Sequence, residues 1–170
     1  TGRGMAEDMI TAEQHEEVMK WLVRVQQTMP YGVKATAAPH YRRVWLQEQR
    51  RAGITAEEGE KKRADLLGRA PKGVNDGDGF VFISHIGEVY PSGFLPVVCG
   101  NVRERPLAEI YRNSPIMRQL RDKSLLKGKC GVCEFREICG GSRARAYAVT
   151  GDYLASDPYC AYMPQGAGSQ

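Results

Sequence analysis

The chain has 170 residues, of which 42% are hydrophobic, and a formal net charge of +4. This length allows one domain or one and a half, and no apolar run approaches the ~18 residues that a membrane helix needs, so we expect no membrane partner. The 24 Lys and Arg residues are interleaved with 20 Asp and Glu residues, which argues against a nucleic-acid partner. We therefore expect a soluble, cytoplasmic protein.

Residues 11–29 have the pattern of an amphipathic helix. Thr11 can cap its N-terminus and can form a capping box with Gln14. Apolar residues at helical spacing predict the buried face of this helix: Val18, Leu22, Val25 and Met29.

A short strand over residues 33–37 and a second helix over residues 41–51 are expected next. Pro30 would end the first helix and Gly53 the second. Strand, loop and helix in this order fit the end of an α/β barrel, because alone they would leave an apolar face uncovered. We assign residues 1–47 to the C-terminal remnant of such a barrel.

Residues 48–79 have the composition of a charged, flexible linker. Ten of the eighteen residues from Glu48 to Asp65 are charged, and Thr55 could cap a solvated helix there. Residues 73–79 are rich in Gly and Asp, which favours a flexible turn or loop. The later glutamate that a calcium loop requires is absent, so we do not expect calcium.

Residues 80–163 predict a small domain with mixed secondary structure, followed by a tail over residues 164–170. Residues 80–84 and 89–90 flank Gly87 and favour a β-hairpin.

Three helices are expected in the rest of this domain. The first two cover residues 106–112 and 115–121, and Ser114 is placed to cap the second, which begins with a proline. Ser142 can cap the last helix, which Gly151 would end.

Four of the five cysteines have the spacing of one metal site: Cys130, Cys133, Cys139 and Cys160. Two thiols separated by two residues can reach a metal from one tight turn, and two more complete the set that zinc or an iron–sulfur cluster requires. Disulfides are not expected, because the cysteine count is odd and no signal peptide is visible. Buried free thiols and structural zinc stay open as alternatives. The third cysteine does not repeat the C-x-x-C pair of a zinc knuckle, so the spacing favours one 4Fe–4S cluster.

The residues around these cysteines predict how the chain would stabilise an anionic cluster. The last helix begins three residues after Cys139, so its N-terminal N–H groups would point toward the cluster. N–H···S bonds are expected from Gly131, Gly140 and Gly141. Basic residues nearby in sequence could offset the negative charge, with a solvated surface as the alternative for each: Lys127, Lys129, Arg136, Arg143 and Arg145.

Several segments carry a family resemblance: residues 87–91 (GEVYP), 100–103 (GNVR), 107–111 (LAEIY), the C-x-x-C-x₅-C-G-G motif and the late Cys160. Together they resemble the C-terminal auxiliary-cluster region of radical SAM enzymes of the SPASM/Twitch group. Residues 1–4 and 38–43 are similar to the closing part of the barrel in such enzymes. Two-cluster members usually carry cysteines where this chain has Ser92 and Arg143, so the resemblance implies a single auxiliary cluster.

The resemblance implies an α/β (α+β) fold, with the end of a partial radical SAM barrel followed by a Twitch/SPASM-like domain of a β-hairpin plus helices. It also implies a role in electron transfer or active-site organisation during radical modification of a tetrapyrrole or peptide substrate. A non-catalytic Cys₄ zinc-binding interaction module is the alternative.

The C-x-x-x-C-x-x-C loop of radical SAM chemistry does not occur in the sequence, and the chain begins at Thr1 without an initiator methionine. We interpret the chain as the C-terminal part of a longer oxidoreductase or maturase. Its expected partner is an N-terminal radical SAM domain, which would bind S-adenosylmethionine. Alone, the chain is not expected to cleave S-adenosylmethionine.

Candidate substrate contacts follow the presumed barrel strand. His40, Arg42 and Arg43 could meet an anionic substrate, although an ordinary helix start with a surface basic pair explains the same residues. Cys99 would be an unpaired remnant or a residue on the substrate side. His15 is expected on an exposed helix face with a structural role.

Overall fold

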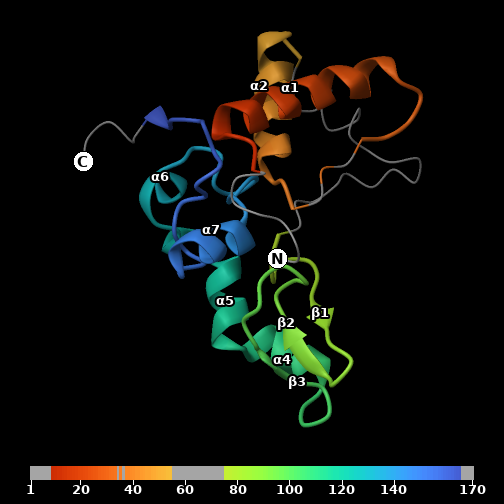
Figure 1. Cartoon of the computed structure of the whole chain (residues 1–170), viewed down its shortest axis with the longest axis vertical. Helices are drawn as coiled ribbons and strands as arrows, with labels where there is room; N and C mark the ends of the chain where they lie inside the picture. The colour runs from red at the N-terminus through yellow and green to blue at the C-terminus, as the bar shows by residue number, and fades with distance from the viewer. Residues whose placement is uncertain (1–8, 34, 36, 55–74, 166–170) are drawn as a thin grey trace.

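The computed structural model describes residues 9–33, 35, 37–54 and 75–165. Along the long axis of the molecule, a pair of helices lies at one end, short helices follow, and a small sheet occupies the other end (Figure 1). None of the helices in these ranges is long and apolar enough to cross a membrane. The mixture of helices with a small antiparallel sheet is consistent with the expected α/β class.

Helix α1 covers Ala12–Thr28 and is capped as predicted. The Thr11 side chain accepts a hydrogen bond from the Gln14 backbone N–H at 3.2 Å, and the Gln14 side chain accepts one from the Thr11 N–H at 2.8 Å. These two bonds satisfy N–H groups that an α-helix leaves without partners at its start. The capping box is therefore confirmed.

Helix α2, His40–Arg51, packs against α1 through a small apolar core: Met19, Val23, Val44 and Trp45. The predicted buried face of α1 is only partly right. Leu22 packs against this core as predicted, but Met19 and Val23 are the buried residues, and Val18 and Met29 are exposed. The position of α2 decides which side of α1 is covered, and the sequence of α1 does not contain that information.

The predicted strand over residues 33–37 is not found at its described residues, Val33, Ala35 and Ala37. Ala37 has a φ of 54°, which lies outside the strand region and turns the backbone toward α2. Lys34 and Thr36 lie outside the described residues.

The predicted hairpin is confirmed and belongs to a three-stranded antiparallel sheet in the order β1–β2–β3. The strands are β1 Phe82–Ile83, β2 Glu88–Tyr90 and β3 Gly100–Asn101. Gly87 makes the turn with a φ of 88°, and its N–H donates to the Ser84 carbonyl at 2.9 Å. Strand β3 was not predicted, because a Gly-Asn pair has low strand propensity.

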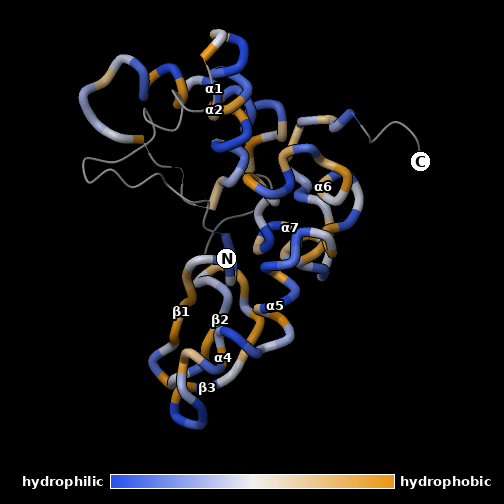
Figure 2. The backbone as a smooth tube through the Cα atoms, turned by 180° about the vertical axis from the view of Figure 1, so that it is seen from behind, coloured by the Kyte–Doolittle hydropathy of each residue, from blue (hydrophilic) through white to orange (hydrophobic). Residues whose placement is uncertain are grey.

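The remaining helices follow the sheet in the order α4 Leu107–Asn113, α5 Pro115–Arg121, a 3₁₀ turn Lys123–Leu125, α6 Gly128–Gly131 and α7 Arg143–Thr150. The three predicted helices correspond to α4, α5 and α7. Ser142 caps α7 by accepting from the Arg145 N–H at 3.3 Å, but the Ser114 side chain makes no cap bond to α5. Strand β1 is hydrophobic, whereas α1 and α2 alternate between hydrophilic and hydrophobic stretches (Figure 2).

The predicted linker is described only at its two ends. Residues 55–74, including the helix cap expected at Thr55, lie outside the described residues. Residues 75–77 are buried, with Asn75 9% exposed and Asp76 7% exposed. Asn75 binds the loop that carries the third cysteine, and Asp76 binds the start of α7, as described below.

Candidate metal centre

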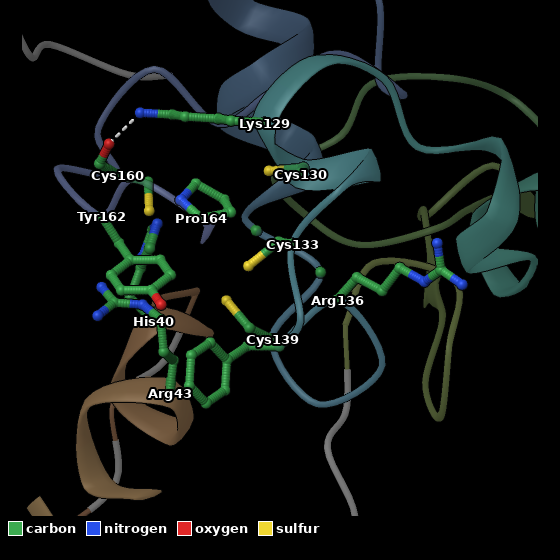
Figure 3. A pocket seen from close by; sticks show the side chains of 13 residues that line it. His40, Arg43, Lys129, Cys130, Cys133, Arg136, Cys139, Cys160, Tyr162 and Pro164 are labelled. Atoms are coloured by element: carbon green, nitrogen blue, oxygen red, sulfur yellow. Dashed lines mark hydrogen bonds between the residues drawn. The ribbon is translucent and has the colours of Figure 1, made fainter. Parts of the chain in front are cut away.

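The four cysteines predicted as ligands line one cavity. Their sulfur atoms point into the same space, three from the segment around α6 and the fourth from the C-terminal segment (Figure 3). The other lining residues come from α2 and from both of these segments: His40, Arg43, Lys129, Phe135, Arg136, Gly140, Gly141, Tyr162 and Pro164.

Short turns place the first three thiols on one side of the cavity. Cys130 lies in α6, and the chain then turns twice, with the Arg136 N–H donating to the Cys133 carbonyl at 3.0 Å and the Cys139 N–H to the Phe135 carbonyl at 2.9 Å. Gly140 and Gly141 follow, each with a φ of 64°. This left-handed pair, which favours glycine, reverses the chain into α7 directly after the third thiol.

Each thiol meets one backbone N–H group. The Asp157 N–H donates to Cys130 Sγ at 3.4 Å. The other three donors each follow their own cysteine by two residues: Phe135 for Cys133, Gly141 for Cys139 and Tyr162 for Cys160. Such N–H···S bonds favour a thiolate over a thiol. Of the three glycines predicted as donors, only Gly141 is among them.

The thiols differ in how readily they ionise. Burial raises the pKa of Cys139 to about 12 and raises that of Cys133 as well. Burial also acts on Cys160, but the contact with His40 and the charges of His40 and Arg43 outweigh it and lower the pKa. Since metals bind thiolates, ligation at this site would release protons.

His40 and Asp157 form a buried pair beside Cys160. Both side chains are almost fully buried, and His40 Nε2 lies 3.2 Å from Asp157 Oδ2. Asp157 also accepts from the Ser142 N–H at 2.7 Å and lies 3.2 Å from Arg145 Nε. Burial raises the pKa of Asp157, but these partners hold it well below its usual range. The carboxylate therefore joins α2, α7 and the segment that carries Cys160.

The candidate substrate residues lie around this pair. His40 and Arg43 line the cavity and are each 1% exposed. Arg43 binds Glu16 and Gln47, and its guanidinium lies 4.7 Å from the centre of the Tyr162 ring. Contact with a substrate stays a prediction for these residues.

Arg42 and Cys99 face other parts of the molecule. Arg42 donates to the Ile138 carbonyl at 3.2 Å, which ties α2 to the cysteine loop. Cys99 is 8% exposed, packs with Val89, Ile110 and Met117, and is not among the residues that line the cavity. Their substrate roles also stay predictions.

His15 is half-buried and not on an exposed face as expected. Its ring packs edge-on against His40 at 5.0 Å, and burial, together with His40 and Arg145, lowers its pKa to about 4. The sequence of α1 has charged residues on both sides of its apolar face, so it does not indicate that His15 packs against His40.

The N-terminal N–H groups of α7 were predicted to point toward the cluster. They bind two carboxylates instead. Asp76 Oδ2 accepts from the Ala144 N–H at 3.0 Å, and Asp157 accepts from the Ser142 N–H. Carboxylates are stabilised at a helix N-terminus, because the helix dipole is positive there. The two aspartates therefore take the place predicted for the cluster.

Asn75 is a supporting residue that the sequence did not reveal. Its Nδ2 donates to the Cys139 carbonyl at 3.3 Å and to the Gly141 carbonyl at 2.8 Å. Both bonds hold the loop that leads from the third cysteine into α7. An Asn-Asp-Gly sequence ordinarily indicates a turn, so this contact across the fold could not be predicted.

The five basic residues predicted to offset cluster charge have different partners. Arg143 is buried and donates to Cys130 Sγ at 3.8 Å. Lys129 binds the Cys160 carbonyl, Lys127 pairs with Asp152 and Arg145 pairs with Asp157. Arg136 is exposed, and its guanidinium points away from the cavity (Figure 3).

Comparison with known proteins assigns the cysteine-bearing region to a family. Residues 76–134 match the SPASM family, described as an iron–sulfur cluster-binding domain. Residues 76–134 therefore belong to a SPASM domain. Cys130 and Cys133 lie inside the match, and the cavity adds Cys139 and Cys160 from beyond its end. The resemblance to the SPASM auxiliary-cluster region of radical SAM enzymes is thereby confirmed, and the zinc-module alternative is not favoured.

Relatives of the SPASM chain include AdoMet-dependent heme synthases. The protein of that name from Methanosarcina barkeri is 44% identical over 164 residues, which is 96% of this chain and 46% of the relative. The one from Nitratidesulfovibrio vulgaris is 43% identical over 97% of this chain and 44% of the relative. A PqqA peptide cyclase from a Methylobacterium species is 35% identical over 59% of this chain and 28% of the relative. The SPASM chain thus spans less than half the length of each of these relatives.

Proposed function

We propose that Cys130, Cys133, Cys139 and Cys160 bind one 4Fe–4S auxiliary cluster of a radical SAM enzyme. The observation that carries this proposal is the convergence of four thiols, each with its own backbone N–H donor, on one cavity. Two of the four thiols lie within the SPASM match. A bound cluster of this kind supplies one-electron redox chemistry. The chain would supply four thiolates, N–H···S bonds and positive charge.

The family match supports a cluster over a single zinc ion. Zinc and iron–sulfur clusters both accept four thiolates, so the ligand set alone fits either. The SPASM match over residues 76–134 is described as an iron–sulfur cluster-binding domain, and Cys130 and Cys133 lie inside it. This match is the reason to assign the four thiols to a cluster.

The number of thiolate ligands limits the roles that the cluster can have. With every iron ligated by the protein, no iron is left to bind substrate, which favours electron transfer or organisation of the active site. His40, Arg43 and Tyr162 occupy the side of the cavity next to α2. On that side they would exclude water and fix the orientation of the Cys160 ligand.

The proposed substrate class is a tetrapyrrole. The heme synthases match over 96–97% of this chain, including both helices of the α1–α2 pair, while the peptide cyclase matches over 59%. We further propose that α1 and α2 complete a radical SAM barrel, whose remaining part binds S-adenosylmethionine. A cytoplasmic location fits this chemistry, because the thiols must stay reduced.

The test uses the complete enzyme and a Cys133→Ser variant, with cluster content verified for both. We expect the variant to form 5′-deoxyadenosine from S-adenosylmethionine while it loses at least about tenfold in formation of the tetrapyrrole product. Unchanged product formation without the auxiliary cluster would contradict the proposed role. Cys99→Ser is the matched control, because its thiol lies in a separate apolar core, and it should retain product formation.

A further inference from the structure

Arg143 is a buried cation whose hydrogen bonds surround the ligand Cys130. The residue is 1% exposed. Its guanidinium donates to the Tyr153 carbonyl at 3.0 Å, to the Ala155 carbonyl at 2.7 Å and to the Gly141 carbonyl at 3.3 Å. The remaining nitrogen, Nη2, lies 3.8 Å from Cys130 Sγ. Three carbonyls thus fix the plane of the guanidinium and direct its free edge at the sulfur.

Gly141 leaves the space in which the Arg143 guanidinium approaches the Cys130 thiol. A Cβ at Gly141 would lie 2.5 Å from Arg143 Nη2, 3.0 Å from the Asp157 Cβ and 3.2 Å from Cys130 Sγ. The first contact is shorter than real Cβ atoms show and the other two are tight, so a side chain at position 141 would push the guanidinium out of its place beside the thiol. Glycine at this position lets the two groups meet.

The charge of Arg143 requires an anion in the same buried space. A guanidinium stays protonated in proteins, and a buried charge is costly unless an opposite charge compensates it. Within the described part of the chain, no Asp or Glu forms an ion pair with Arg143. Asp152 interacts electrostatically with its charge, but this carboxylate pairs directly with Lys127 at 2.6 Å. The direct partners of the Arg143 guanidinium are carbonyls and one sulfur. A thiolate that belongs to an anionic cluster supplies the compensating charge.

We propose that Arg143 positions and compensates the Cys130 thiolate and thereby raises the reduction potential of the auxiliary cluster. The inference rests on the proposed cluster. Reduction by one electron adds negative charge to the cluster, and a buried cation bonded to a ligand sulfur stabilises the reduced form more than the oxidised form. Net charge and hydrogen bonds to the sulfurs are among the factors that set such potentials.

The test measures the midpoint potential by anaerobic redox titration of this chain, followed by the electron paramagnetic resonance signal of the reduced cluster. Arg143→Met removes the charge and the bond to sulfur but keeps an unbranched side chain. We expect the equilibrium constant for reduction to fall at least about tenfold, which is a potential about 59 mV more negative. Arg143→Lys keeps the charge and should give a smaller fall.

Arg136→Met is the matched control. Arg136 also lines the cavity, so the variant removes the same charge near the same site. Its guanidinium, however, is exposed, points away from the sulfurs and pairs with Glu137 at 3.2 Å, where solvent and salt screen it. We expect less than about a threefold change in the equilibrium constant. Equal shifts in Arg143→Met and Arg136→Met would overturn the inference.

Three further outcomes are separable. A wild-type chain that takes up no iron contradicts the proposed cluster and this inference with it. A wild-type chain that holds the cluster while both Arg143 variants fail to assemble it gives Arg143 a structural role only, which overturns the inference alone. If only Arg143→Met fails to assemble the cluster, the potential of Arg143→Lys decides. A midpoint potential equal to that of the wild type overturns the inference, and a more negative one supports it.

Discussion

At the scale of single residues, Cys160 and Cys99 differ in what surrounds their thiols. Cys160 faces the cavity beside His40, and its pKa is lowered by that contact despite burial. Cys99 packs among apolar side chains, and burial raises its pKa. A thiol that ionises readily and shares a cavity with three others is suited to bind metal, whereas a thiol in an apolar core behaves as a small hydrophobic side chain.

Replacement of these two cysteines should therefore have opposite results. Cys160→Ser should lower iron content to less than about half and destabilise the fold, because metal-binding energy is also folding energy. Cys99→Ser should leave iron content unchanged. Iron analysis after anaerobic reconstitution checks both variants. An empty site in Cys99→Ser with a full site in Cys160→Ser would show that the ligand set is wrong.

The sequence predicted the ligands but not the residues that support them. C-x-x-C spacing and nearby glycines are local features, so the four cysteines could be recognised directly. Asp157 and Asn75 act through contacts with residues far away in sequence, as in the 66-residue separation of Asn75 and Gly141. Local sequence contains no signal of such contacts. For the same reason, the sequence suggested a substrate contact for His40 but could not reveal its buried contact with Asp157.

At the scale of elements, the turn between Cys139 and α7 sets the geometry of the site. Gly141 has a φ of 64°, and a Cβ there would meet Arg143, Asp157 and Cys130. Gly151 ends the same helix with a φ of 75°, and a Cβ there would meet nothing within 4 Å. The two glycines share the left-handed backbone but differ in the space around them.

This difference predicts how alanine acts at the two positions. Gly141→Ala should lose most of its iron, because the backbone must move away from Cys130, while Gly151→Ala should keep it and show only the cost of about 1 kcal/mol for left-handed alanine. Iron content per chain and thermal unfolding measure the two effects. Equal iron retention in both variants would contradict a steric role for Gly141.

Asp157 is the residue that joins three elements. It contacts His40 at the start of α2, Arg145 in α7 and the Ser142 N–H at the start of α7. Removing one partner of a buried ion pair leaves an uncompensated charge, which costs about 3–5 kcal/mol. Asp152 pairs with Lys127 on the surface, where such pairs contribute about 0–1 kcal/mol.

Asp157→Asn should therefore lower the thermal midpoint by about 10 °C, and Asp152→Asn by no more than about 3 °C, given the usual dependence of the midpoint on stability for a chain of this size. Circular dichroism of the anaerobic protein measures both midpoints. Similar midpoints for the two variants would show that Asp157 does not hold α2 to the cluster segment.

The helices and the hairpin could be predicted because their signals lie within each segment. The α1 capping box, the proline at the start of α5 and the glycine of the hairpin each act over a few residues. The orientation of α1 and the absence of a strand at the described residues of 33–37 depend on what packs against them. Those features could be found only in the folded molecule.

At the scale of the whole molecule, a helix pair and a SPASM domain share one metal centre. His40 and Arg43 of α2 line the same cavity as the four cysteines, and His15 of α1 lies against His40 and 3.4 Å from Arg145. The cavity is thus lined by α2 and by residues between 129 and 164, which are far apart in sequence. We infer that cluster binding stabilises the contact between the helix pair and the SPASM domain, because both supply its walls.

The number of irons and sulfides per chain tests the central claim most directly. After anaerobic reconstitution, we predict about four irons and four acid-labile sulfides per chain, in a brown protein whose reduced form gives the electron paramagnetic resonance signal of one 4Fe–4S cluster. The four thiolates supply the complete ligand set of one such cluster. A colourless protein that holds about one zinc per chain and takes up no iron would contradict the account.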